Sequence, residues 1–123
     1  VVVSVEPQTT IFRPSADVMM VSAAEVFAEP LLGVIMTGMG KDGLQGLKKI
    51  KEKGGYVLAQ DEQSCVVYGM PKVAVEEGVA DEILPLAQIP DALIQIAGLH
   101  KGSKAGRAAH NELILNQEKR ILL

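Results

Sequence analysis

Two short apolar runs separated by a helical pattern form the middle of the chain. The first covers residues 31–36 and the second covers residues 56–60, and the segment between them keeps a helical period up to Lys53. Parallel strands need a long crossover connection, which is usually a helix. The pattern therefore predicts a βαβ unit with two buried, parallel strands. The glycine-rich residues 37–43 follow the first strand, and functional groups gather at this end of parallel strands.

The pattern on either side predicts further elements. Residues 1–5 are typical of a buried strand, and a loop is expected up to Arg13. A helix is predicted to begin after Ser15 as its N-cap and to end at Pro30. Its expected buried stripe consists of Val18, Met19, Ser22, Ala23, Val26 and Phe27. Downstream, the pattern predicts an apolar segment over 65–68, a helix over 72–77, a short edge strand over 81–85 and a helix over 89–98.

Composition changes after residue 99. Residues 100–110 are basic and glycine-rich, which indicates a flexible linker, and an apolar tail follows over residues 112–123. We therefore predict a compact α/β portion over residues 1–99, followed by linker and tail over residues 100–123. The chain opens in mid-strand without an initiator methionine, so we expect a fragment of a longer domain. A truncated sheet leaves an edge or face uncovered, which predicts self-association into a homo-oligomer.

Composition and charge narrow the classes of function. A chain of 123 residues is one domain or part of one, and its net charge of -3 gives no reason to expect nucleic acid or an anionic membrane as partner. No apolar run is long enough to span a bilayer, and no signal peptide is present. One cysteine and two distant histidines argue against a disulfide and a zinc site. A metal-free cytoplasmic protein is expected.

Three interpretations of the glycine-rich loop are open on the residues alone. In the first, Gly38, Gly40 and Gly43 have the spacing of a dinucleotide-binding fingerprint, and Asp61 supplies an acidic residue for the ribose. Asp42 argues against this interpretation, because its carboxylate would lie where the pyrophosphate must meet the helix N-terminus.

The other two interpretations give Asp42 a role of its own. As an N-cap, it would begin a helix at Gly43 and form a capping box with Gln45, while the glycines allow a tight turn and close packing. As a catalytic group, it would orient a histidine from another loop, and N–H groups of the glycine-rich turn would face an oxyanion. A carboxylate has enough lone pairs for both.

Longer blocks of sequence resemble a known family. The blocks are RPSADV at 13–18, TGMGKDG at 37–43, GG at 54–55, AQDE at 59–62 and SCVVYGMP at 64–71. In their order and spacing they resemble the catalytic domain of chemotaxis protein-glutamate methylesterase (CheB). The resemblance covers about residues 1–97 and implies an α/β fold: a three-layer, doubly wound, mainly parallel sheet with helices on both faces. It also implies a cytoplasmic Ser-His-Asp hydrolase that demethylates glutamates on the cytoplasmic helices of chemoreceptors, releasing methanol. Many family members also deamidate receptor glutamines.

The resemblance assigns roles to individual positions. Asp42 corresponds to the third triad member, and the backbone N–H of Met39 would contribute to the oxyanion hole. Gly38, Gly40 and Gly43 are the glycines of this site loop. No cofactor and no metal is implied. Whether a response-regulator receiver domain precedes the esterase is left open.

The family's nucleophilic serine and catalytic histidine both lie upstream of the Arg-Pro-Ser block. The chain is therefore expected to hold only the back half of the site and to be inactive alone. The remaining candidates match nothing catalytic: His100 and His110 lie in or beside the linker, and Ser15, Ser64 and Ser103 lie outside any nucleophile elbow. Cys65 has no histidine near it in sequence and is expected to be a buried, unreactive residue. The alternative is a non-catalytic interaction module that binds a partner through its apolar tail.

Overall fold

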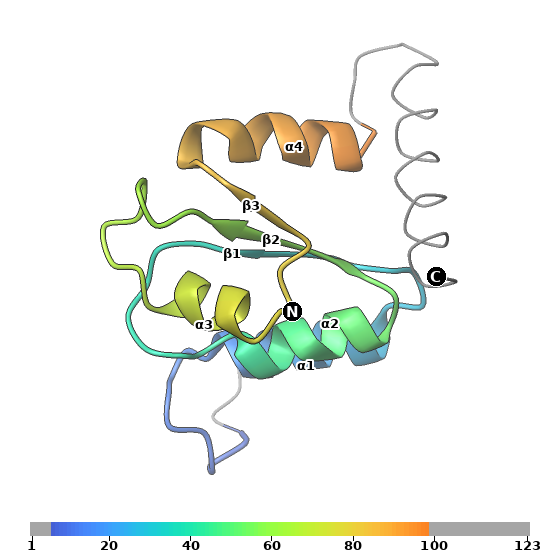
Figure 1. Ribbon diagram of the computed structural model, residues 1–123. Helices are drawn as coiled ribbons and strands as arrows, with labels where there is room; N and C mark the ends of the chain where they lie inside the picture. The colour runs from blue at the N-terminus through green and yellow to red at the C-terminus, as the bar shows by residue number, and fades with distance from the viewer. Residues whose placement is uncertain (1–5, 99–123) are drawn as a thin grey trace. The chain divides into compact units, whose positions relative to one another are not determined.

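The computed structural model describes residues 6–98, and the chain divides into two compact units between Pro85 and Leu86. The first unit contains the elements α1 (Ala16–Val26), β1 (Leu32–Ile35), α2 (Leu44–Glu52), β2 (Tyr56–Gln60), α3 (Met70–Glu76) and β3 (Glu82–Leu84) (Figure 1). The second contains a 3-10 turn, η1 (Leu86–Gln88), and the helix α4 (Ile89–Ile96). The predicted strand over 1–5, the boundary at 99–100 and the linker and tail lie outside the described residues.

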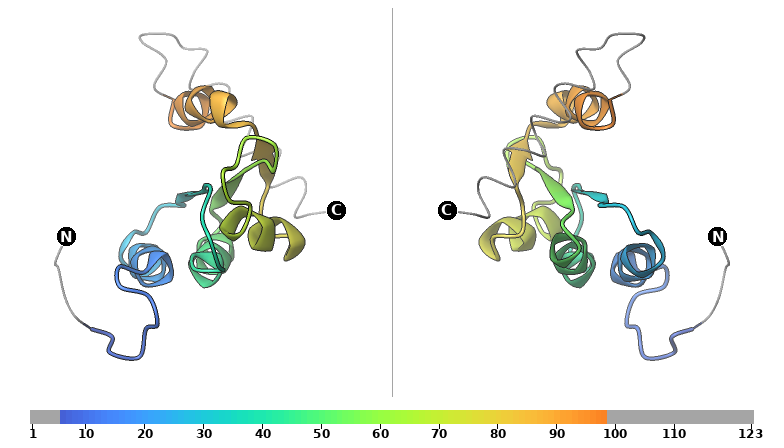
Figure 2. Two further views of the ribbon diagram at one scale, coloured as in Figure 1. Left: turned by 90° about the vertical axis from the view of Figure 1, so that its left-hand side faces the viewer. Right: turned by 90° about the vertical axis from the view of Figure 1, so that its right-hand side faces the viewer.

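The strands form a parallel sheet in the order β1-β2-β3. In the pairing of β1 with β2, Leu32 lies opposite Tyr56 and Ile35 lies opposite Ala59. Strand β2 pairs with β3 from Leu58, which lies opposite Glu82. Helices α1, α2 and α3 lie on one face of this sheet (Figure 2). The predicted βαβ unit and the α/β class with a parallel sheet are confirmed, and among the described strands β3 lies at an edge, as Pro85 suggested.

The core of the first unit lies between the sheet and its helices. Alternating strand residues such as Ile35, Val57 and Ala59 point toward Leu47 and Ile50 of α2. Helices α1 and α2 approach closely at Gly46, where a Cβ atom would lie 2.4 Å from the Cβ of Met20. Only glycine leaves room for this contact between the two helices.

The buried face of α1 differs from the predicted stripe. Met20 and Ala24 are buried, whereas Met19, Val26 and Phe27 are 58%, 78% and 61% exposed. Apolar residues occupy most positions from 18 to 24, so the helical period fits more than one stripe. The contact with Gly46 on α2 decides which stripe is buried. The helix also ends at Val26, before Pro30, and the N–H of Phe27 closes its last turn on the carbonyl of Ala23.

The remaining elements follow the predictions closely. Ser15 is the N-cap of α1, and its side chain accepts a hydrogen bond from the N–H of Val18. Helix α3 has Pro71 in its first turn and ends just before Gly78. None of the helices within residues 6–98 combines the length and apolar character needed to cross a membrane.

Two aspartates link the N-termini of α1 and α2. The carboxylate of Asp42 accepts hydrogen bonds from the N–H groups of Ala16 (2.6 Å) and Asp17 (3.1 Å) at the start of α1. In return, Asp17 accepts a hydrogen bond from the N–H of Gly46 (2.8 Å) at the start of α2. Each aspartate therefore caps the helix to which it does not belong, so that free N–H groups at both ends find an anionic acceptor.

The predicted capping box of α2 is wrong. The helix begins at Leu44 with Gly43 as N-cap, and no side chain of its own caps it. Gly43 has a φ of 100°. The turn there leaves Asp42 one residue too early to cap α2, and its carboxylate is directed to α1 instead.

Replacing Asp17 by alanine is expected to lower the free energy of unfolding by about 1 kcal/mol, because the N–H of Gly46 loses its acceptor. Asp17→Asn keeps a side-chain oxygen and should retain most of the stability. Urea unfolding of the 123-residue chain measures both. The control is Asp91→Ala, at an exposed position in the first turn of α4, and equal losses for Asp17→Ala and Asp91→Ala would contradict the assignment.

Candidate functional site

The glycine-rich loop lies at the carboxyl end of β1 and is held there by the chain that follows β2. The N–H of Thr37 donates to Oε1 of Gln60 (2.9 Å). The hydroxyl of Thr37 donates to the carbonyl of Val67 (3.1 Å) and accepts from the N–H of the same residue (2.9 Å). The start of the loop is thus fixed by a side-chain partner 23 residues downstream and a main-chain partner 30 residues downstream.

A second set of contacts joins the two loops backbone to backbone. The carbonyl of Gly38 accepts from the N–H groups of Gly69 (3.1 Å) and Met70 (2.8 Å), and Gly38 forms a parallel bridge with Tyr68. A Cβ atom on Gly69 would lie 2.6 Å from the carbonyl oxygen of Gly38 and 3.1 Å from the nitrogen of Gly40. Position 69 therefore needs glycine for space, since its backbone has an ordinary negative φ.

Gln60 is the buried polar side chain of this region, with 1% of its surface exposed. Its Oε1 accepts from Thr37, and its Nε2 donates to the carbonyl (2.8 Å) and hydroxyl (3.1 Å) of Ser64. Both ends of the amide are satisfied, as burial requires. Gln60 thereby connects the ends of β1 and β2 with the turn after β2. The sequence shows Gln60 only as part of a resembling block, and its hydrogen bonds could not be predicted from it.

Asp42 is the carboxylate of the site that accepts the most hydrogen bonds. Besides the two N–H groups of α1, Oδ1 accepts a hydrogen bond from the hydroxyl of Ser15 (3.0 Å). Partial burial raises the pKa of Asp42, but hydrogen bonds from Ala16, Asp17, Ser15 and Gly43 outweigh it and bring that pKa below the ordinary value. The carboxylate is therefore ionised at neutral pH.

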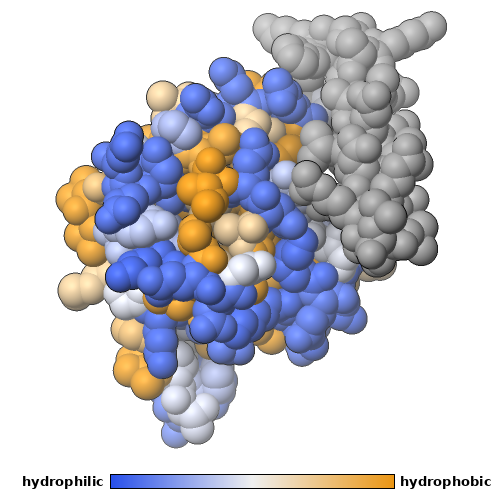
Figure 3. Space-filling view, viewed as in Figure 1, coloured by the Kyte–Doolittle hydropathy of each residue, from blue (hydrophilic) through white to orange (hydrophobic). Residues whose placement is uncertain are grey.

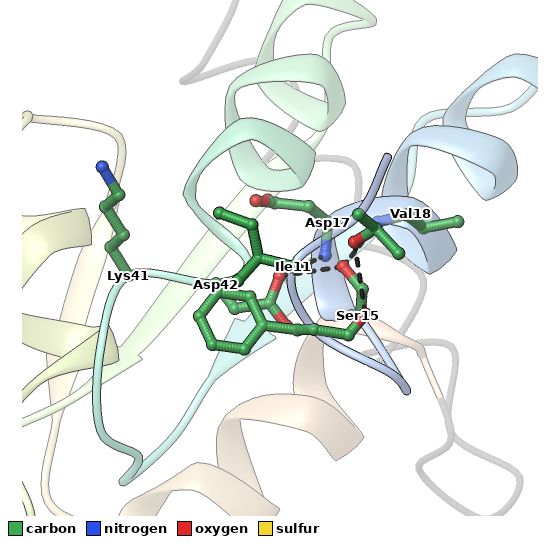
Figure 4. A pocket seen from close by; sticks show the side chains of 8 residues that line it. Ile11, Ser15, Asp17, Val18, Lys41 and Asp42 are labelled. Carbon is green, nitrogen blue, oxygen red and sulfur yellow. Dashed lines mark hydrogen bonds between the residues drawn. The ribbon is translucent and has the colours of Figure 1, made fainter. Parts of the chain in front are cut away.

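A pocket of about 180 Å³ opens beside this carboxylate (Figure 4). Its wall combines apolar groups from the loop before α1 with polar groups from the start of α1 and from the glycine-rich loop. The lining residues are Thr10, Ile11, Phe12, Ser15, Asp17, Val18, Lys41 and Asp42. In Figure 4 the ammonium end of Lys41 points away from the two aspartates, so it does not neutralise them.

The other residues of the predicted site loop lie as a tight turn. Gly40 and Gly43 have φ values of 86° and 100°, which favour glycine. Gly43 is buried, and a Cβ atom there would lie 3.0 Å from the side chain of Ile35. Met39 is 84% exposed, and its N–H has no protein acceptor among residues 6–98. The glycines therefore provide the turn and close packing that the loop needs, whichever function it has.

Within residues 6–98 no histidine is present, and the serine that reaches Asp42 is Ser15, whose hydroxyl is engaged as the N-cap of α1. His100, His110 and Ser103 fall outside this range, and the hydroxyl of Ser64 is hydrogen-bonded to Asp61. Burial raises the pKa of the Cys65 thiol, and the charges of Asp61 and Glu62 raise it further against an opposing hydrogen bond from Thr37. The thiol is therefore protonated and unsuited to attack. No cluster of metal-ligating side chains occurs in residues 6–98.

The N-terminus of α2 also bears on the dinucleotide interpretation. In a dinucleotide site this end of the helix binds the pyrophosphate. Here the carboxylate of Asp17 already occupies the N–H of Gly46. With Asp42 beside it, two negative charges lie where an anion would have to bind, which counts against this interpretation.

Comparison with known proteins decides the family. Residues 2–93 match the CheB methylesterase family. The chain belongs to this family. A protein-glutamate methylesterase/protein-glutamine glutaminase of Pyrococcus horikoshii is 48% identical over 90 residues, which are 73% of this chain and 24% of that protein. The protein-glutamate methylesterase FrzG of Myxococcus xanthus is 56% identical over 84 residues, which are 68% of this chain and 25% of FrzG.

A solved structure confirms the fold of the CheB methylesterase family for this chain. The catalytic domain of Thermotoga maritima CheB methylesterase is 49% identical and superposes with a TM-score of 0.66, covering 68% of this chain and 44% of that domain. The chain spans about a quarter of the length of the curated relatives it matches. The family resemblance predicted from the sequence blocks is thus confirmed, while the roles of Asp42 and Met39 stay predictions.

The hydrogen bonds to Asp42 should make stability depend on pH. Because the folded-state pKa lies below the unfolded-state value of about 3.9, the ionised carboxylate stabilises the fold above that value. This contribution is lost as the pH falls through the folded-state pKa. The difference in unfolding free energy between the native chain and Asp42→Asn should therefore be largest at about pH 6 and shrink below about pH 4.

Urea unfolding at a series of pH values measures this difference. Asp91→Asn, which removes a carboxylate at an exposed position in α4, is the matched control against which the difference for Asp42→Asn is compared. A difference for Asp42→Asn that persists unchanged into acid would contradict the role of its charge.

Proposed function

We propose that this chain is the C-terminal portion of the catalytic domain of a protein-glutamate methylesterase. In this proposal Asp42 is the third member of a Ser-His-Asp triad, and the serine and histidine come from polypeptide that precedes the Arg-Pro-Ser block. The observation that carries the proposal is an ionised, rigidly held carboxylate at the carboxyl end of a parallel strand, in a chain of the CheB methylesterase family.

The geometry of Asp42 suits the work of a triad aspartate. Such a group holds the histidine in the correct tautomer and stabilises the imidazolium that forms when the serine loses its proton. The group must be ionised, and it must not rotate. Donors from Ser15, Ala16 and Asp17, with the N–H of Gly43, meet both needs. The pocket beside Asp42 offers space for the approaching imidazole.

Met39 completes the proposed machinery on this chain. Met39 is an exposed residue in a tight glycine turn, and its N–H has no acceptor within residues 6–98, so this N–H is available to an oxyanion. The anchoring of Thr37 and Gly38 supports a fixed position for this turn. A fixed donor stabilises the tetrahedral intermediate without reorganisation during the reaction.

The proposed substrate is a glutamate methyl ester on a cytoplasmic helix of a chemoreceptor, hydrolysed to glutamate and methanol in the cytoplasm. The names of the relatives support this substrate class, and several also include a glutaminase activity, so deamidation of receptor glutamines is proposed as a second reaction. The machinery on this chain needs no cofactor and no metal. An upstream receiver domain, a homo-oligomer and the alternative of a non-catalytic module stay predictions.

The 123-residue chain alone is expected to release no methanol from methylated receptor above the rate without protein. Triad members act as a unit, so an aspartate without its nucleophile and base contributes almost nothing to hydrolysis. Methanol release by the purified chain, measured against the same preparation carrying Asp42→Asn, tests this. Turnover that the substitution abolishes would overturn the proposed division of the site.

A chimera tests the role of Asp42 directly. The aligned part of this chain would replace its counterpart in the Thermotoga maritima CheB methylesterase catalytic domain, to which it is 49% identical. In that chimera Asp42→Asn is expected to lower kcat by about 10⁴-fold, as loss of the triad carboxylate does in serine proteases. Methanol release from methylated receptor is the measurement.

The matched control in the chimera is Asp61→Asn, a carboxylate that follows β2 and accepts from the N–H of Ser64. The control should keep most of the activity, since an asparagine oxygen can still accept that bond. A normal kcat in Asp42→Asn, together with lower stability, would show that Asp42 only caps α1.

A further inference from the structure

We propose that Ser15 is a positioning residue for Asp42, with its hydroxyl fixing the orientation of the proposed triad carboxylate. This inference rests on the proposed function and goes beyond it. Neither the family resemblance nor the comparisons assign a role in the reaction to Ser15.

The hydrogen bonds of Ser15 determine the direction of its O–H. The oxygen Oγ accepts from the N–H of Val18 (3.3 Å), because Ser15 is the N-cap of α1. A serine hydroxyl has one proton to donate. That proton is directed to Oδ1 of Asp42, 3.0 Å away. Because the carboxylate is ionised at neutral pH, this oxygen can accept a hydrogen bond but cannot donate one. Capping of α1 therefore holds the hydroxyl in place and aims it at the carboxylate.

Three successive residues donate to the same carboxylate. The N–H of Ala16 binds Oδ2, while the N–H of Asp17 and the hydroxyl of Ser15 bind Oδ1. Bonds to both oxygens prevent the carboxylate from turning. The main-chain donors, from Ala16 and Asp17 at the start of α1 and from Gly43, cannot be removed by a side-chain substitution. Within residues 6–98, Ser15 is the one side chain that supplies a donor to Asp42, so it is the position where orientation can be weakened selectively.

The charged groups around Asp42 leave this role to Ser15. Asp17, the other carboxylate lining the pocket, binds the N–H of Gly46. Lys41 also lines the pocket, but its ammonium points away (Figure 4). No salt bridge involves Asp42 within residues 6–98. Neutral donors at the start of α1 thus hold the carboxylate, and they leave its full negative charge for an imidazolium.

Glycine and threonine at position 15 separate positioning from helix capping. Glycine is an adequate N-cap, only slightly weaker than serine, but it has no hydroxyl to donate. Threonine keeps both the cap and the donor. In the chimera described above, Ser15→Gly is expected to lower kcat about tenfold with KM unchanged, because the lost bond acts on the carboxylate and not on substrate. Ser15→Thr should return kcat to within about twofold of the parent.

A double variant tests whether Ser15 acts through Asp42. In the Asp42→Asn background, Ser15→Gly should cause almost no further loss of kcat, since the group it orients is gone. Far-UV circular dichroism and urea unfolding would establish that each variant is folded. An equal loss in both backgrounds would overturn the inference, because Ser15 would then act independently of Asp42.

The outcomes distinguish this inference from the proposed function. If Asp42→Asn loses activity while Ser15→Gly keeps the parent kcat, the positioning role fails and the triad assignment stands. If Asp42→Asn keeps the parent kcat, the triad assignment fails, and the positioning role fails with it. The tenfold loss in Ser15→Gly, its recovery in Ser15→Thr and its absence beside Asp42→Asn together support the inference.

Discussion

The reciprocal capping of α1 by Asp42 and of α2 by Asp17 is the interaction on which the rest of this structure depends. Two helices that begin side by side present two sets of free N–H groups and two positive dipole ends to each other. Asp42, from the loop before α2, binds the start of α1, and Asp17, from the first turn of α1, binds the start of α2. The same reciprocal capping brings the two helices together at Gly46, where no side chain separates α2 from Met20 of α1. It thereby fixes the buried face of α1 and the position of the candidate site at once.

The glycine-rich loop follows from this arrangement as a segment held at its two ends. At the end near β1, Thr37 and Gly38 are bound to Gln60 and to the loop after β2. At the end near α2, Asp42 is bound to α1. The residues between carry little side-chain contact, and Met39 is open to solvent. On the face of the molecule drawn in Figure 3, orange apolar patches interrupt the blue polar surface. A loop that is fixed at both ends and open between them meets the requirement of a site that stabilises a developing charge, because its donors need not reorganise.

Much of this could be predicted from the sequence because it depends on local signals. The apolar runs, the proline positions and the N-cap at Ser15 gave the βαβ unit, the helices and the place of the glycine-rich loop. The blocks around Asp42 gave the family. The errors concern contacts between distant segments: the carboxylate of Asp42 meets donors 25 to 27 residues away, and Asp17 meets one 29 residues away. A capping box was the nearest local use for Asp42. The donors that Asp42 meets depend on how two helices pack, and the apolar stretch of α1 allowed several packings.

Gly69 shows how the absence of a side chain can define a functional loop. The chain after β2 passes so close to Gly38 and Gly40 that a single methyl group would collide with the main chain. The placement of the Met39 amide therefore depends on the missing side chain of Gly69, thirty residues further along the chain, and not on a polar group at that position. An inspection of side-chain chemistry alone would overlook Gly69. A designer who transferred the glycine-rich loop to another scaffold would also have to place a glycine, equivalent to Gly69, in the segment that packs against it.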